Sequence, residues 1–432
     1  MVMVKLAVRF AAAIALVAAL QTPAPSGDAR ALYIAALAAK EKGDLAGYLT
    51  NARDAAALRP MHPIILYHLA SAYALNHQPE QAGDVLRRLA NLAVYRDIAN
   101  DPSFASAVNH RSIQTAIRDL VRVKHRRIGA GTVYRTIPDP AFIPEGIAYD
   151  PTSRSLFVSS QHERKIVRID PDGRVTDFIT EAQDGIWMVF GIAIDPARRR
   201  LWAVSTAERP MRGFRDADEK RAGLFAFDLT NGKLVQKIVM EPSDAPPHYF
   251  DDLTIAPDGR VFLSDGGSST VYVLQPGERE LRVLVAPRTI QGPNGLAMTP
   301  DGRWLYVSDY AGFIVRVDPA SGEATRLPQP KNVAIYGIDG LSWHSTGLIG
   351  IQNGVEPSRV LRLQLSPTGL EIRKVEILEM NNPAFEEPTL GVVVGDDLYC
   401  VANSHGGVLR RDAETVSKRL LSPPAIVRVR LK

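Results

Sequence analysis

The sequence predicts a six-bladed β-propeller preceded by a small α-helical domain. After residue 131, short strands of β-branched and aromatic residues recur six times, at intervals of about 45 residues. Before residue 125, Ala and Leu recur at the three- and four-residue spacing of helices. A chain of 432 residues also exceeds the usual size of one compact core. We therefore expect a helical domain at 28–125 and a propeller at 131–432.

Residues 1–24 have the pattern of a signal peptide. Lys5 and Arg9 precede an Ala-rich apolar run that ends at Leu20, and Pro23 follows soon after. The run is shorter than the ~20 residues that span a bilayer as a helix. We therefore expect a periplasmic or secreted protein without a transmembrane span in the mature chain. An uncleaved membrane anchor is the alternative, because no clean small-x-small cleavage site is present.

The helical segment resembles tetratricopeptide repeats. Leu69, Ala70 and Tyr73 match that motif in a second helical hairpin, and Gly43 and Pro60 match it in a first. Two such hairpins with a capping helix make a small solenoid. It is interpreted either as a packing arm for the larger domain or as a groove for a protein partner. The expected helices cover 33–42, 45–58, 64–75, 80–92 and 113–123.

Composition argues against a nucleic-acid partner. The net charge is only +4, and 23% of the residues are charged. The basic residues are scattered apart from the cluster at 124–127, and no basic stripe alternates with aromatics. A hydrophobic content of 46% is that of an ordinary soluble globular protein. The expected partner is a small-molecule substrate, for reasons that lie in the candidate site described below.

Each propeller unit begins at one recurring position, and a turn and a second apolar strand follow it. A strand at 132–135 precedes the first unit and another at 426–429 ends the last, so we expect the two chain ends to share one blade. The first strand of a blade lies innermost, and its start therefore faces the mouth of the central tunnel. The six units begin at Gly146, Gly191, Asp252, Gly295, Gly340 and Gly391.

The residues just before these positions suggest a metal site. Blades 2 and 6 supply Phe190 and Leu390, whereas the other four supply side chains with oxygen atoms. Converging carboxylates repel one another unless a cation is bound, and Ca²⁺ prefers carboxylate and amide oxygens. Another divalent cation remains an alternative, although zinc fits less well without His or Cys. A preference for Asp or Asn in tight turns would also explain any single position. The expected ligands are Glu145, Asp251, Asn294 and Asp339.

Further polar residues are expected around the same mouth. The second strands end at Ser160, Ser205, Asp265, Asp309, Asn353 and Asn403, which are candidates to orient the ligands. His162 and His248 lie in neighbouring loops and are candidates for substrate contact, as is Asp251. A surface or packing role is the alternative for each histidine. The charged loop at 206–222 is longer than its counterparts, as a lid would be.

Four motifs resemble those of the senescence marker protein/gluconolactonase (regucalcin-like) family. The resemblance covers about 135–430 and implies a six-bladed propeller that binds a divalent ion through Glu145, Asn294 and Asp339. It also implies that Asp339 is a general base that activates water. The family has an Asn where this chain has Asp251 and an Arg where it has Tyr249, so specificity for a sugar lactone is not implied. The motifs are Pro144-Glu145-Gly146, Asp251-Asp252, Pro293-Asn294-Gly295 and Asp339-Gly340.

Three functional hypotheses follow from the sequence. The first is an exported metal-dependent hydrolase, acting on a lactone or related ester with water activated by Asp339. The second is a non-catalytic propeller that Ca²⁺ stabilises and that binds a ligand or a protein. The third, a non-hydrolytic reaction of the strictosidine synthase type, rests on wider resemblance only. Propellers support many activities, so the fold alone does not separate these hypotheses.

Overall fold

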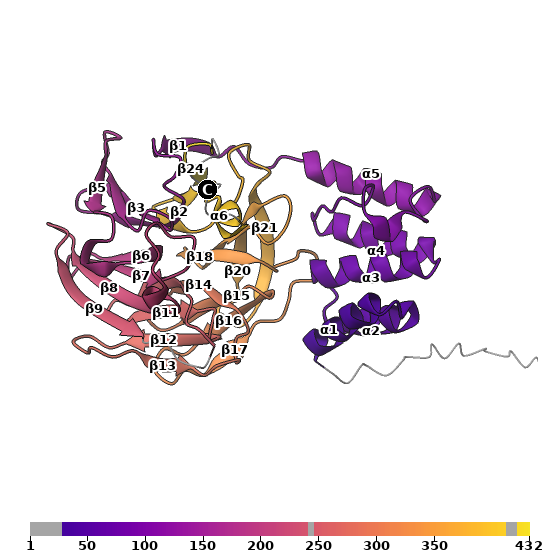
Figure 1. Cartoon of the computed structure of the whole chain (residues 1–432), viewed down its shortest axis with the longest axis horizontal. Coiled ribbons are helices and arrows are strands. Elements are labelled where there is room, and N and C mark those ends of the chain that lie inside the picture. The colour runs from indigo at the N-terminus through magenta and orange to yellow at the C-terminus, as the bar shows by residue number, and fades with distance from the viewer. Residues whose placement is uncertain (1–27, 241–245, 412–420) are drawn as a thin grey trace, which may run out of the picture.

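The computed structural model describes residues 28–240, 246–411 and 421–432. The predicted signal peptide at 1–24 lies outside these ranges. Within them, no helix is long and apolar enough to cross a membrane. The chain forms a helical arm followed by a propeller, and the arm stands beside the propeller as a stack of helices (Figure 1).

The arm consists of five α-helices and has the helical hairpins that the sequence predicts. Asp28 and Asp44 cap the first two helices by accepting backbone N–H groups, and a Pro begins each of the next two. Small Ala side chains fill the interior of the stack and let the helices approach closely. The resemblance to tetratricopeptide repeats stays a prediction. The helices are α1 (Ala29–Glu41), α2 (Leu45–Leu58), α3 (Pro63–Leu75), α4 (Pro79–Asn91) and α5 (Arg111–His125).

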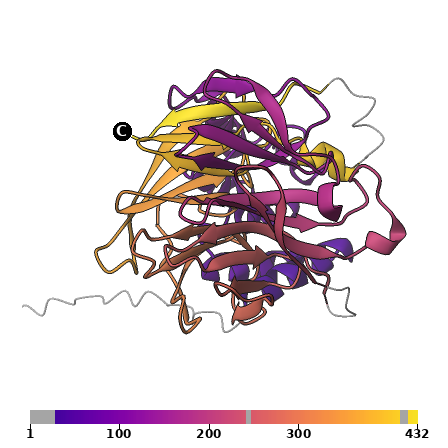
Figure 2. The same ribbon diagram turned by 90° about the vertical axis from the view of Figure 1, so that its left-hand side faces the viewer.

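The propeller has six four-stranded antiparallel sheets, which confirms the predicted fold class. Figure 2 views the molecule from the propeller side, with the helices behind the sheets. Blade 1 contains β2 (Pro144–Asp150), β3 (Ser155–Ser160), β4 (Ile166–Ile169) and β5 (Val175–Ile179). Blade 2 contains β6 (Met188–Asp195), β7 (Arg200–Thr206), β8 (Ala222–Asp228) and β9 (Leu234–Met240). Blade 3 contains β10 (Phe250–Ile255), β11 (Val261–Asp265), β12 (Thr270–Leu274) and β13 (Arg282–Val285).

Blade 6 is assembled from both ends of the propeller sequence, as the sequence predicts. Its strand order is β1-β24-β23-β22, with β1 outermost. This pairing closes the ring. Blade 4 contains β14 (Pro293–Met298), β15 (Leu305–Asp309), β16 (Phe313–Val317) and β17 (Ala324–Arg326). Blade 5 contains β18 (Ile338–His344), β19 (Gly347–Gln352), β20 (Arg359–Leu365) and β21 (Ile372–Met380). Blade 6 contains β22 (Gly391–Val394), β23 (Asp397–Val401), β24 (Ala425–Arg430) and β1 (Thr132–Thr136).

A fully buried arginine joins the arm to blade 5. The guanidinium of Arg359 donates to the carbonyl oxygens of Leu92 and Ala93 at 3.0 Å, both just after α4. It also donates to the carbonyl oxygen of Ala334 at 3.1 Å and to the side chain of Gln352. Burial lowers the pKa of Arg359 to about 10. The arm is therefore held against the same blade that carries Asp339.

Candidate metal centre

The four predicted ligand residues lie at equivalent β-bulges in four blades. In blade 1, Pro144 pairs with Ser160 and Ile147 with Val158, so that Glu145 and Gly146 together oppose one residue. The same irregularity recurs at Asp251, Asn294 and Asp339, and at the apolar Phe190 in blade 2. A bulge turns a side chain out of the regular alternation of a strand. Here it presents the residue before the recurring Gly position to the tunnel mouth.

The Gly that follows three of these residues allows neighbouring inner strands to approach closely. A Cβ atom on Gly146 would lie 2.4 Å from the carbonyl oxygen of Phe190, on the inner strand of the next blade. A Cβ atom on Gly295 would lie 2.3 Å from the carbonyl oxygen of Asp339. Contacts this short exclude a side chain. The recurrence of Gly thus has a packing cause that is independent of turn preference.

One cavity of about 230 Å³ brings all four predicted ligands together. The apolar ring of Phe190 also contributes to its wall, together with polar side chains from loops and from blade 6. The sequence analysis did not single out several of these residues. The cavity is lined by Glu145, Gln161, Phe190, Tyr249, Asp251, Asn294, Tyr310, Asp339, Asn353, Glu387, Thr389 and Ser404.

Hydrogen-bond donors from the neighbouring loops orient the carboxylates of the cavity. The Gln161 amide donates to Glu145, and the Asn353 amide donates to Asp339. The hydroxyl of Tyr310 donates in turn to the Asn353 oxygen at 2.9 Å. Asn353 is thus in contact with Asp339, as the sequence predicts, and its role in orienting a metal ligand stays a prediction. In contrast, Ser205 accepts from the backbone N–H of Trp187 and only supports the local fold.

The carboxylate of Asp251 sits in an environment that opposes its charge. Burial, and then the nearby charges of Asp339, Asp265 and Asp252, raise its pKa well above the ordinary value. The Gly266 N–H donates to it at 2.9 Å and partly offsets this effect. Burial likewise raises the pKa of Asp252 to about 7, although the Leu296 N–H donates to it. A cation would relieve the unfavourable charge at this mouth.

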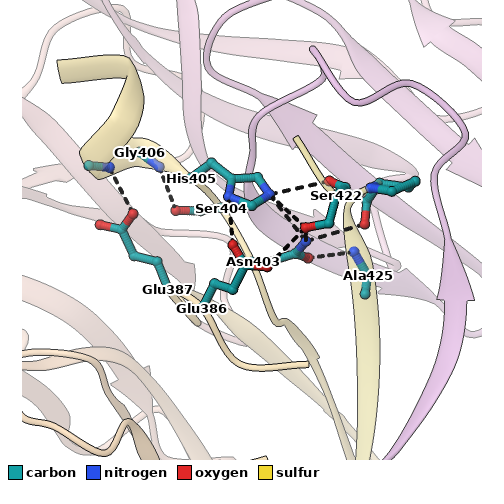
Figure 3. A network of polar contacts seen from close by, with 10 residues as sticks. Glu386, Glu387, Asn403, Ser404, His405, Gly406, Ser422 and Ala425 are labelled. Atoms are coloured by element: carbon teal, nitrogen blue, oxygen red, sulfur yellow. Dashed lines mark hydrogen bonds and ion pairs between the residues drawn. The ribbon is translucent and has the colours of Figure 1, made fainter. Parts of the chain in front are cut away.

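Glu387 adds a carboxylate that the repeat pattern did not indicate. Blade 6 has Leu390 at the recurring position, but Glu387 reaches the cavity from three residues earlier. Its carboxylate accepts the Gly407 N–H at 2.7 Å, within the network of polar contacts in Figure 3. In that network the His405 ring lies between Glu386 and Ser422, at 3.2 Å from each. The sequence signal was the pair of adjacent glutamates just before the sixth unit.

The two predicted histidines lie outside this cavity. His248 is hydrogen-bonded to the buried Asp265, with 2.6 Å between Nδ1 and the carboxylate, and lines a neighbouring cavity. His162 lines neither of these two cavities; its Nδ1 lies 2.8 Å from the carbonyl oxygen of Pro210. His162 thereby contacts the 206–222 loop. A lid function for this loop stays a prediction.

The donor set at the tunnel mouth fits a hard cation. It consists of carboxylate and amide oxygens, which are the ligands that Ca²⁺ prefers, and contains neither imidazole nor thiolate. In the described part of the chain, no group of three or more His, Cys, Asp or Glu is positioned to hold a metal ion. The predicted carboxylate ligands Glu145, Asp251 and Asp339 share the cavity but do not form such a group. Metal binding therefore stays a prediction that rests on the chemistry of the donors.

One family model matches most of the propeller and more than half of the chain. The family model described as "SMP-30/Gluconolactonase/LRE-like region" matches residues 143–377. No curated protein matches the chain by sequence.

Several solved propeller structures are similar at low identity. A gluconolactonase from Xanthomonas campestris is 18% identical, with a TM-score of 0.47, over 71% of this chain and 91% of that one. The PQQ-bound aldose sugar dehydrogenase from Streptomyces coelicolor is also 18% identical, with a TM-score of 0.48, over 70% and 98%. A virginiamycin B lyase from Staphylococcus aureus is 14% identical, with a TM-score of 0.44, over 63% and 81%.

Proposed function

The chain belongs to the SMP-30/gluconolactonase/LRE-like family, and we propose that it is an exported metal-dependent hydrolase of a lactone or related ester. The observation that carries this proposal is the convergence of four oxygen-bearing side chains on one cavity at the tunnel mouth. Each comes from the same bulged position of a different blade. A purely structural propeller has no need of four carboxylates in one small cavity, because their mutual repulsion opposes folding.

The proposed ligands of the cation are Glu145, Asp251, Asn294 and Asp339. Ca²⁺ is the expected ion because all their donor atoms are oxygens, and another divalent cation is the alternative. When bound, such an ion polarises a carbonyl group and stabilises the negative charge that develops on its oxygen. The amides of Gln161 and Asn353 restrict the rotation of two of the carboxylates. Affinity for metal therefore depends on these amides as well as on the ligands.

Asp339 is the proposed general base. Its side chain is 9% exposed and accepts the Asn353 amide, so its position in the cavity is defined. A carboxylate in this position accepts a proton from the attacking water, and the proton is later available to the leaving alkoxide. Asp251, His248 and His162 are proposed to contact the substrate, with His248 the better placed of the two histidines because it lines the adjoining cavity.

Two proposals concern the cell and the arm. The charged and apolar pattern at 1–24 supports export to the periplasm or beyond. The arm is proposed to contact a protein partner, since its helices stack beside the propeller and leave the tunnel-mouth cavity lined by propeller residues alone. A non-catalytic, Ca²⁺-stabilised binding module is the competing function.

Metal analysis and a substrate panel test the proposal. Purified protein, dialysed against Ca²⁺, is expected to retain about one ion per chain, whereas Glu145→Gln and Asn294→Ala retain less. Asp258→Asn, in an exposed turn outside the cavity, is the matched control and retains the ion. Lactones and esters are then assayed with and without a chelator. Protein that binds the ion but hydrolyses no member of the panel would favour the binding module, and protein that binds no ion would refute the proposed site.

A further inference from the structure

A second and larger cavity lies next to the candidate metal centre. Its volume is about 800 Å³, and it opens between the 206–222 loop and the start of β10. The two cavities share Tyr249, whose ring packs edge-on against Phe190 at 5.0 Å. The second cavity is lined by Thr206, Ala207, Glu208, Arg209, Pro210, Phe214, Glu219, Lys220, Pro247, His248, Tyr249, Gly266 and Gly267.

The two cavities are adjacent, and the side chain of Tyr249 lies between them. Gly266 contributes to the second cavity, and its N–H donates to Asp251 of the first. A molecule that places its reacting group at the carboxylates therefore has an adjoining space for its remaining part, beyond the Tyr249 ring. The 2.6 Å pair with buried Asp265 fixes the His248 ring in the wall of that space.

The wall chemistry favours an apolar occupant. Phe214, Pro210 and Pro247 present apolar surface, and the glycines add no polar side chain. The charges at the rim compensate one another. Arg209 lies over the Phe214 ring at 5.2 Å and forms an ion pair with Glu219 at 3.7 Å, while Lys220 and Glu208 carry opposite charges. No excess of one sign at this rim would attract an ionic or polyhydroxylated group.

We propose that this cavity binds an alkyl or aryl substituent of the lactone or ester, so that the substrate class is apolar-substituted rather than sugar-derived. The inference rests on the proposed function at the neighbouring carboxylates. It agrees with Tyr249 and Asp251, which provide an aromatic ring and a carboxylate where the family described in the sequence analysis has Arg and Asn. Each methylene buried in such a cavity is expected to raise kcat/KM about two- to fourfold, up to the length that the cavity accommodates.

Three lactones with the same six-membered ring test this preference directly. δ-Decanolactone carries an alkyl chain that δ-valerolactone lacks, and glucono-δ-lactone carries hydroxyl groups instead. With Ca²⁺ present, the kcat/KM for δ-decanolactone is expected to exceed that for the other two by about tenfold or more. Glu219→Trp, which places a large ring at the exposed rim and obstructs the cavity, is expected to reduce this preference strongly. Asp216→Trp is the matched control, because Asp216 also pairs with Arg209 but does not line the cavity.

A binding measurement separates this inference from the proposed hydrolysis. The lactams that correspond to the two lactones resist hydrolysis, and their affinities are measured by calorimetry. Tighter binding of the alkyl-substituted lactam that Glu219→Trp loses and Asp216→Trp keeps would support the cavity even if no lactone were hydrolysed. Equal affinity of both lactams for the wild-type protein would overturn the inference, whatever the outcome of the hydrolysis assay.

Discussion

Replacing Gly295 by Ala tests whether close packing of the inner strands sets the geometry of the metal centre. Gly295 follows the proposed ligand Asn294 in blade 4, and its Cα faces the inner strand of blade 5. An added Cβ atom would lie 2.3 Å from the carbonyl oxygen of Asp339 and 2.6 Å from the backbone nitrogen of Leu341. Both obstacles are backbone atoms, so a change of side-chain rotamer cannot relieve them.

The size of the effect follows from these distances. Ordinary contacts of a Cβ atom begin at 3.4 Å, so the two strands must separate by about 1 Å. Overpacking of this kind costs about 1–3 kcal/mol of stability. The same separation moves Asn294 away from Asp339. A displacement of about 1 Å at a reacting centre lowers the rate by about 100-fold, which corresponds to about 2.7 kcal/mol of activation free energy. The loss of activity is therefore expected to be as large as the loss of stability.

Thermal denaturation, Ca²⁺ titration calorimetry and lactone kinetics would measure these quantities on the same preparations. Gly292→Ala is the control, because the nearest atom to its added Cβ is 3.6 Å away and no clash results. It is expected to match the wild-type protein in all three assays. If Gly295→Ala were to bind Ca²⁺ with wild-type affinity, the idea that strand separation positions the ligands would be wrong.

Three other predictions concern the pH response, the orientation of the general base and the arm. Burial, and then Arg59, lower the pKa of His62 from 6.5 to about 3. As the pH falls from about 6.5 toward 3, the unfolded chain binds this proton before the folded protein does, so the stability of the fold decreases. The melting temperature of His62→Gln should therefore depend less on pH in this window. Asn353→Leu should weaken Ca²⁺ binding about 10- to 100-fold by calorimetry, because Asp339 loses its orienting amide; unchanged affinity would contradict this role. Arg359→Met should lower the free energy of unfolding by about 1–3 kcal/mol in urea, because buried carbonyl groups lose their donor, and limited proteolysis should then release the arm.

The propeller and the four oxygen-bearing residues at its tunnel mouth were predictable because both arise from repetition. Each blade repeats one packing problem, so the same short strands and the same Gly recur at a readable interval. Glu145, Asp251, Asn294 and Asp339 share one register position, and a closed ring brings equal positions to one mouth. Local hydrogen-bonding rules alone do not predict this convergence.

Residues that enter the site from loops were harder to predict. Glu387 comes from outside the repeated position, in the loop before the inner strand of blade 6. Its placement depends on loop conformations that the strand pattern does not encode. The contact of Arg359 with the arm spans more than 260 residues of sequence, and no local pattern distinguishes it from any other strand arginine.

The shared blade has a consequence for how the protein is made. β24 ends at Arg430, two residues before the last residue of the sequence, and it must pair with β1 and β23 to close blade 6. During synthesis on the ribosome, β1 emerges first and remains unpaired until β24 emerges, after the strands of the other five blades. Ring closure, and with it the complete tunnel mouth, can therefore follow only after β24 has emerged. The cavity at the tunnel mouth is thus completed in a single late step of folding, after all six inner strands have emerged.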